Sequence, residues 1–220
     1  MRSVRVWFKK TGTAIYISHL DMNRCFSRAV VRAKIPLWYT EGFNPKPYLN
    51  FLCPLPLGQE GINEPLDIRI EGEISNDEVE SALCAVMPQG IEINRVTDPV
   101  MKTAQITSAQ YKINLVFGSE DTANEFCVSA DEIIKSGRLT AEKRSKKGNK
   151  TVNLCEMIKA FAVKADGCHV LTETETATGS SSNLNPDLLL SALFEKTGLE
   201  PVSRNISRLC LLNENGTEFC

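Results

Sequence analysis

Basic side chains that could bind phosphate recur along one predicted helix within the first fifty residues. Arg24, Arg28 and Arg32 are spaced four residues apart, so they share one helix face, opposite the apolar residues Met22 and Phe26. Like charges at this spacing repel one another by roughly a few tenths of a kcal/mol unless an anion lies beside them. The pattern therefore predicts a cationic face that binds phosphate. The alternative interpretation is an ordinary solvated face.

The loop after this helix carries aromatic and polar side chains on a rigid backbone. Gly42 permits unusual backbone angles, and Pro45 and Pro47 fix their own φ. Beside basic groups, such a loop suits a platform on which a base stacks while phosphate is held nearby. The alternative is that the aromatic rings pack beneath the loop. The residues assigned here to nucleic-acid binding are Tyr39, Gly42, Phe43, Asn44 and Lys46.

A second basic segment runs from Glu142 to Lys150 and contains a Gly-Asn pair suited to a tight turn. A basic hairpin tip can contact a phosphate backbone and contribute salt-dependent affinity without sequence readout, whereas the alternative is a loop that only aids solubility. The residues assigned here to nucleic-acid binding are Lys143, Arg144, Lys146, Lys147 and Lys150. Arg204 and Arg208, four apart in a predicted strand, would share a face and add to this surface.

His19 is the candidate general base in this part of the sequence. It directly follows Ser18, the predicted helix cap, and could be held near a phosphate or a ribose hydroxyl, with Arg24 or Lys46 stabilising developing charge. A structural or ligand-contacting histidine is the interpretation that we favour, so no catalytic residue is assigned.

The composition indicates a globular protein and argues against several other classes. Of the 220 residues, 42% are hydrophobic, and no apolar run is long enough for a signal peptide or a membrane span, so we expect a cytoplasmic protein without a membrane partner. The eight cysteines are scattered, and no two have metal-ligand spacing. We therefore expect reduced core cysteines, no metal site and no cofactor.

The net charge of −2 hides a strong asymmetry along the chain. Residues 1 to 50 contain nine Lys and Arg against two acids, whereas residues 60 to 98 contain two against ten. This distribution fits a basic face for an anionic partner and an acidic face that aids solubility or meets another protein.

The predicted elements that must position these residues form two similar series. Residues 1–98 alternate as strand, helix, strand, strand, helix and strand, with helix starts marked by Ser18 and Ser75. Residues 108–220 repeat this order with an extra basic hairpin. The sequence therefore predicts an α+β fold of two tandem ferredoxin-like (split βαβ) units with antiparallel sheets: a first unit with the basic helix and the Gly/Pro loop, and a second, elaborated unit with the hairpin.

Several motifs resemble the uncharacterised radical SAM-linked protein family. They are the YISHLD run that starts at Tyr16, the arginine helix, the GFNPKP loop that starts at Gly42, the PLG turn at Pro56 and the EPLDI run at Glu64. In that family the domain occurs alone or fused after a radical S-adenosylmethionine domain. The resemblance thus implies a radical S-adenosylmethionine protein as partner. Because the chain lacks a Cys-x-x-x-Cys-x-x-Cys motif, the iron–sulfur chemistry would be on another polypeptide.

The leading functional hypothesis is an RNA-binding accessory protein of bacterial type. It would act with a radical S-adenosylmethionine enzyme in RNA or ribosome-related metabolism and hold tRNA or rRNA. Two alternatives stay open: an RNA-processing or RNA-modifying enzyme that uses His19, and a protein-interaction module that docks the radical enzyme through residues 60 to 98. We expect an accessory role rather than an enzyme acting on its own.

Overall fold

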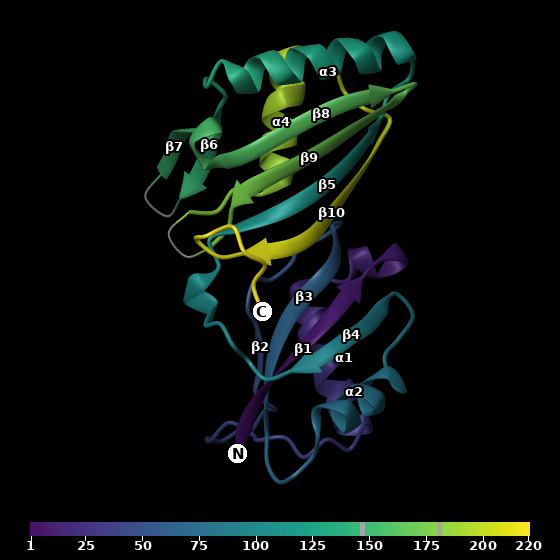
Figure 1. Ribbon diagram of the computed structural model, residues 1–220, viewed down its shortest axis with the longest axis vertical. Helices are drawn as coiled ribbons and strands as arrows, with labels where there is room; N and C mark the ends of the chain where they lie inside the picture. Colours follow the sequence, from purple (N-terminus) through teal and green to yellow (C-terminus); the bar gives the residue numbers. More distant parts are fainter. Residues whose placement is uncertain (146–147, 180–181) are drawn as a thin grey trace. The chain divides into compact units, whose positions relative to one another are not determined.

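The computed structural model describes residues 1–145, 148–179 and 182–220, and it is a mixed α+β protein whose strands pair antiparallel (Figure 1). The described residues form four α-helices and two compact units. The first unit comprises residues 1–105 with 218–220, and the second comprises residues 106–217. The α+β class predicted from the sequence is confirmed.

The sheet of the first unit contains four strands: β1 (Arg2–Lys10), β2 (Leu49–Phe51), β3 (Glu60–Ile70) and β4 (Ile91–Thr97). Their order is β4-β1-β3-β2, and each neighbouring pair is antiparallel. Val4 lies opposite Ile68 and Val6 opposite Leu66, so these apolar side chains share the buried face of the sheet.

Two helices cover that face of the first unit. Helix α1 (His19–Arg32) begins where the Ser18 hydroxyl accepts a hydrogen bond from the Asp21 amide, and it buries Met22 and Phe26. Helix α2 (Asn76–Cys84) begins with a capping box between Ser75 and Glu78 and buries Val79 and Leu83. Both helix starts confirm the sequence prediction. Short 3₁₀ turns at Gly12–Tyr16 and Thr103–Gln105 complete the unit.

The sheet of the second unit has the order β10-β5-β9-β8, again with antiparallel neighbours. Its strands are β5 (Ser108–Val116), β8 (Ile158–Asp166), β9 (His169–Ala177) and β10 (Ser203–Leu212). Strands β6 (Thr140–Ser145) and β7 (Gly148–Asn153) form a separate two-stranded ribbon, which a 3₁₀ turn at Leu154–Met157 follows.

Helices α3 (Glu120–Lys135) and α4 (Pro186–Thr197) lie on the same side of the second sheet (Figure 1). Ser119 caps α3. For α4, Asn185 is the cap, Pro186 is the first helical residue, and Gly198 ends the helix at φ 70°, a left-handed conformation that favours glycine. No helix in the described residues is long and apolar enough to cross a membrane.

Candidate nucleic-acid interface

Helix α1 presents the three predicted arginines to solvent, but two of them are held by the chain itself. The Arg24 guanidinium lies 3.0 Å from a carboxylate oxygen of Asp21, and Arg32 donates a 2.6 Å hydrogen bond to the carbonyl of Val86. Hydrogen bonds from Ser18 and then Arg24 lower the pKa of the Asp21 carboxyl. Arg28 makes no ion pair or side-chain hydrogen bond with any residue that the structure describes, and its guanidinium is the most available of the row.

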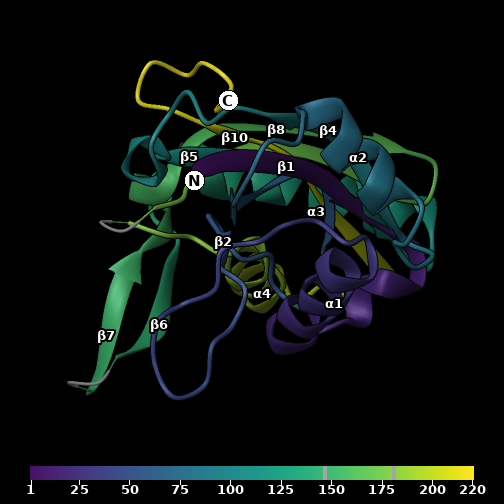
Figure 2. The same cartoon turned by 90° about the horizontal axis from the view of Figure 1, so that it is seen from below.

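The loop between α1 and β2 is closed at its base by backbone contacts. The Thr40 amide donates to the Lys46 carbonyl at 2.8 Å, and the Lys46 amide donates to the Thr40 hydroxyl at 3.1 Å. An isolated β-bridge joins Tyr39 and Pro47 just outside this pair. The loop is seen from below in Figure 2, running between α1 and β2. Its ends are therefore fixed, and its tip is displayed.

The tip of this loop carries the predicted contact residues. Gly42 has φ 138°, a conformation that side-chain-bearing residues rarely adopt. Phe43 is fully exposed, and Asn44 and Lys46 are exposed beside it. Tyr39, at the base, is 43% exposed. A large apolar ring in full contact with water contributes nothing to the protein core, so Phe43 is available to a ligand.

A cation–π stack that was not predicted from the sequence holds the base of the loop. The Arg69 guanidinium lies 4.3 Å from the centre of the Tyr48 ring and 5.2 Å from that of Trp38. The Trp38 amide also donates to the Arg69 carbonyl at 3.0 Å. Trp38 and Tyr48 are thus anchors of the loop, whereas Phe43 and Tyr39 are its displayed rings.

The basic hairpin predicted in the second unit forms the β6–β7 ribbon. Strand β6 carries Lys143 and Arg144 and β7 carries Lys150, with Lys143 paired to Lys150. Lys146 and Lys147, also assigned to nucleic-acid binding, lie outside the described residues. The ribbon therefore places three of the predicted basic positions on two paired strands.

The predicted contribution of Arg208 to a basic surface is wrong. Arg208 is 2% exposed, whereas Arg204, four residues earlier, is exposed and lies 3.3 Å from Asp187. The pairing of β10 with β5 is regular from Ser203 to Arg208, so the two arginines do share a strand face, but it is the face on which Ile206 is also buried.

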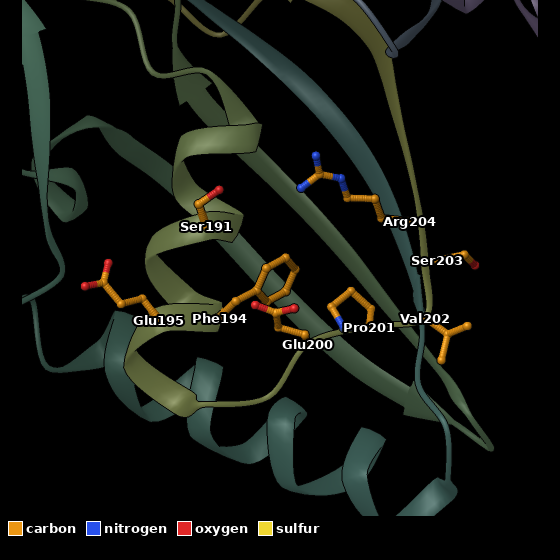
Figure 3. A pocket seen from close by; sticks show the side chains of 8 residues that line it. All are labelled: Ser191, Phe194, Glu195, Glu200, Pro201, Val202, Ser203 and Arg204. Atoms are coloured by element: carbon orange, nitrogen blue, oxygen red, sulfur yellow. The ribbon is translucent and has the colours of Figure 1, made fainter.

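An open pocket of about 560 Å³ in the second unit contains Arg204 but none of the assigned residues (Figure 3). It lies between α4 and the start of β10, and Arg204 extends from β10 toward the helix. Its lining residues are Ser191, Phe194, Glu195, Glu200, Pro201, Val202, Ser203 and Arg204. Two glutamates against one arginine do not favour a polyanion there.

His19 lies on the side of α1 that faces the sheet, away from the arginine row. It lines a small pocket together with Lys10, Cys53 and Glu64, and its ring packs edge-on against Phe51. His19 therefore lies on a different face of α1 from Arg24, and neither Arg24 nor Lys46 lines its pocket. No three His, Cys, Asp or Glu side chains within the described ranges are placed to hold a metal ion.

Sequence reasoning missed Lys10 and Glu64, although a signal for both was present. The alternation Val4, Val6, Phe8 continues to Lys10, and the alternation of Ile68 and Leu66 extends back to Glu64. Each charged residue therefore occupies a position that its strand turns inward. Both side chains are buried, at 2% and 3% exposure.

Taken together, the chain is an α+β protein with an exposed aromatic and basic loop on its first unit. It belongs to the bacterial family described as "Uncharacterized protein conserved in bacteria" (DUF2344), whose model matches residues 3–186. No curated protein matches the sequence.

Two solved structures are similar to this chain. A chain of the "Crystal Structure of a Cbf5-Nop10-Gar1 Complex" is 10% identical with a TM-score of 0.51; the similarity covers 94% of this chain and 48% of that one, so this chain spans about half of its length. At that identity the likeness shows the fold alone. The "Crystal Structure of an Unknown Protein from Galdieria sulphuraria" is 12% identical, with coverage of 94% and 98% and a TM-score of 0.28, too low to support an inference.

Proposed function

We propose that this protein binds RNA and acts as an accessory to a radical S-adenosylmethionine enzyme in RNA or ribosome-related metabolism. The observation that carries the RNA-binding half is the fully exposed Phe43 ring at the tip of a loop whose base is fixed, with Lys46 exposed beside it. Base stacking on an aromatic ring contributes about 1–3 kcal/mol per base, and a neighbouring cation holds the phosphate.

Each unit supplies further cations to the proposed RNA binding: Arg28 on the first unit and the basic ribbon on the second. Arg28 is exposed on α1, and Lys143, Arg144 and Lys150 lie on β6 and β7. Phosphate contacts of this kind give affinity without sequence readout and make it dependent on salt. The proposed RNA is tRNA or rRNA, bound through bases that are not paired.

The partner half of the proposal rests on the resemblance to the radical SAM-linked family, which the motifs from Tyr16 to Glu64 carry. The exposed acids Glu71 and Glu73, on either side of Gly72, offer a docking point for such a protein.

We also propose that the two units are tandem ferredoxin-like folds. The strand order of the two sheets supports this. When the four sheet strands of each unit are counted along the chain, leaving out the β6–β7 ribbon, both sheets have the order fourth, first, third, second.

The proposal is tested by fluorescence anisotropy with labelled tRNA and rRNA fragments over a salt series. We expect Phe43→Ala to weaken binding by about 5- to 150-fold, the equivalent of one lost stack. Lys46→Gln should reduce the logarithmic salt slope by about one. The matched control is Val128→Ala, which shortens an exposed apolar side chain on α3. Absence of binding even at low salt would overturn the RNA half.

The partner is tested separately by co-purification with a radical S-adenosylmethionine protein of the same cell. Reversing charge with Glu71→Lys and Glu73→Lys should abolish the complex and leave RNA affinity equal or slightly higher, because the change adds positive charge. A complex that survives both substitutions would exclude this acidic turn as the docking point.

A further inference from the structure

Two oppositely charged side chains are buried in the first unit on the sheet face that α1 covers. Lys10, at the end of β1, and Glu64, in β3 opposite Phe8, are 2% and 3% exposed. The Lys10 ammonium donates to the carbonyl of Ile17 at 3.0 Å. Removing charged groups from water costs several kcal/mol per ion by order of magnitude, and apolar residues at such positions are often as stable or more so.

These two residues border a small pocket that opens beside His19. Phe51, Cys53 and the apolar side chains of Phe8 and Met22 form part of its wall. The pocket encloses about 20 Å³. A single water molecule needs roughly 10–15 Å³ of cavity space. The pocket therefore admits one hydroxyl-sized group and excludes a nucleobase.

Gly61 makes the room that the Glu64 side chain occupies. A Cβ atom at Gly61 would lie 2.5 Å from Glu64 Cγ and 2.6 Å from Glu64 Oε1, well inside van der Waals contact. Any side chain at residue 61 would therefore displace the carboxylate from its present place.

His19 stands at the mouth of the pocket with its ring orientation fixed. Its ring packs edge-on against Phe51, with centroids 5.3 Å apart. The Asn23 amide nitrogen lies 3.0 Å from His19 Nε2 and also donates to the His19 carbonyl at 3.1 Å. Because an amide nitrogen only donates, Nε2 accepts from Asn23 in this arrangement, and Nδ1 is the ring nitrogen that carries the proton.

We propose that this pocket receives a ribose 2′-hydroxyl of the bound RNA and so distinguishes RNA from DNA. The inference rests on the proposed RNA binding and goes beyond it by naming the group that is recognised. A 2′-hydroxyl both donates and accepts a hydrogen bond. The pocket offers matching groups: the Glu64 carboxylate accepts, whereas the Lys10 ammonium and the His19 ring donate.

The position of the pocket suits a strand that also reaches the Phe43 loop. Phe51, the last residue of β2, lines the pocket, and Pro47, which closes the loop, precedes it by four residues. At about 3.3 Å per residue this is a backbone distance of roughly 13 Å. The pocket thus lies one short strand away from the base of the Phe43 loop, and in the proposal one single-stranded RNA segment contacts both.

The test compares three labelled 12-mers of one sequence: RNA, DNA and 2′-O-methyl RNA, whose methyl group removes the donor and enlarges the substituent. The wild-type protein should bind RNA about tenfold more tightly than the other two, the effect of hydrogen bonds to charged groups. His19→Ala, at an exposed position, and Glu64→Gln, which keeps the side-chain shape, should lower RNA affinity to the DNA level without changing DNA affinity.

Gly61→Ala provides a third variant, and Gly118→Ala is its matched control, because a Cβ at Gly118 meets nothing within 4 Å. Thermal denaturation establishes whether Gly61→Ala is folded; if it is not, His19→Ala decides alone. Equal binding of RNA and DNA by the wild-type protein, or an RNA preference that survives His19→Ala and Glu64→Gln, overturns the pocket and leaves RNA binding intact. No binding of any 12-mer or RNA fragment overturns both.

Discussion

Arg69 stacks on Tyr48, with the guanidinium 4.3 Å from the ring centre, and so holds the base of the loop that displays Phe43. Cation–π contacts contribute about 0.5–2 kcal/mol. We therefore predict that Arg69→Met, which keeps the aliphatic bulk, loosens the loop more than it destabilises the fold. The expected result is faster hydrogen exchange at the Thr40 and Tyr48 amides, with RNA affinity reduced toward that of Phe43→Ala.

Arg95→Met is the matched control for this prediction. The Arg95 guanidinium lies 4.4 Å from the Trp7 ring centre and donates to Asn63, so it makes the same type of contact elsewhere in the unit. It should cost similar stability and leave exchange in the loop and RNA affinity unchanged. Equal exchange in both variants would show that the stack does not order the loop.

The arginine row of α1 gives a second prediction, because its members have different surroundings. Arg28→Gln should leave the free energy of unfolding within about 0.5 kcal/mol and reduce the salt slope of RNA binding by about one. Arg32→Gln should instead cost about 1 kcal/mol, because the hydrogen bond to the Val86 carbonyl is lost. Urea denaturation and anisotropy measure the two effects. Equal changes in the free energy of unfolding and in the salt slope for both variants would refute the different roles given to Arg28 and Arg32.

Local signals in the sequence predicted the helix starts of the first unit correctly. Ser18 and Ser75 each accept a hydrogen bond from the amide three residues later, and the capping pattern depends only on neighbours along the chain. The inward-facing apolar residues of α1 followed from the helical period in the same way.

The sequence could not show which arginines are held by the chain itself, because their partners lie far away in the sequence. Arg32 meets the carbonyl of Val86, 54 residues away, and Arg69 meets rings that lie 21 and 31 positions earlier in the chain. Nothing near these arginines in sequence distinguishes them from Arg28. Lys10 and Glu64 are a different case, because the strand alternation in the sequence was enough to place each of them at an inward-facing position. The structure adds that both line the same pocket as His19.

The buried ion pair of Arg5 gives a third prediction. Arg5 is 1% exposed, its Nε lies 2.7 Å from Asp67 Oδ1, and it donates to the carbonyls of Met101 and Cys220. Asp67→Ala would leave a buried guanidinium without its counter-ion, so we expect a loss of about 3–5 kcal/mol in the free energy of unfolding.

The exposed pair between Arg2 and Asp98, whose nitrogen and oxygen atoms lie 2.9 Å apart, is the control for Asp67→Ala. Its side chains are 36% and 75% exposed. Asp98→Ala should therefore cost at most about 1 kcal/mol, because solvent screens the pair. Chemical denaturation in urea compares the two. Similar losses would mean that burial does not set the strength of the Arg5 pair.

The capping box of α2 gives a prediction about acid stability. The Ser75 amide and hydroxyl each donate to the Glu78 carboxylate at 2.8 Å, and these hydrogen bonds lower the pKa of Glu78. A carboxyl with a lower pKa in the folded than in the unfolded state stabilises the fold above its unfolded pKa. That contribution is lost as the pH falls below the ordinary glutamate pKa of about 4.3 and on through the lower folded pKa. Glu78→Gln should therefore destabilise the protein at pH 7 and flatten the acid limb of its stability profile.

Thermal denaturation from pH 7 to pH 3 measures this effect of Glu78→Gln, with Asp77→Asn, an exposed acid in the same turn, as the control. If the melting temperature of Glu78→Gln changes with pH in the same way as that of the wild type, the capping box does not contribute to the pH dependence of stability.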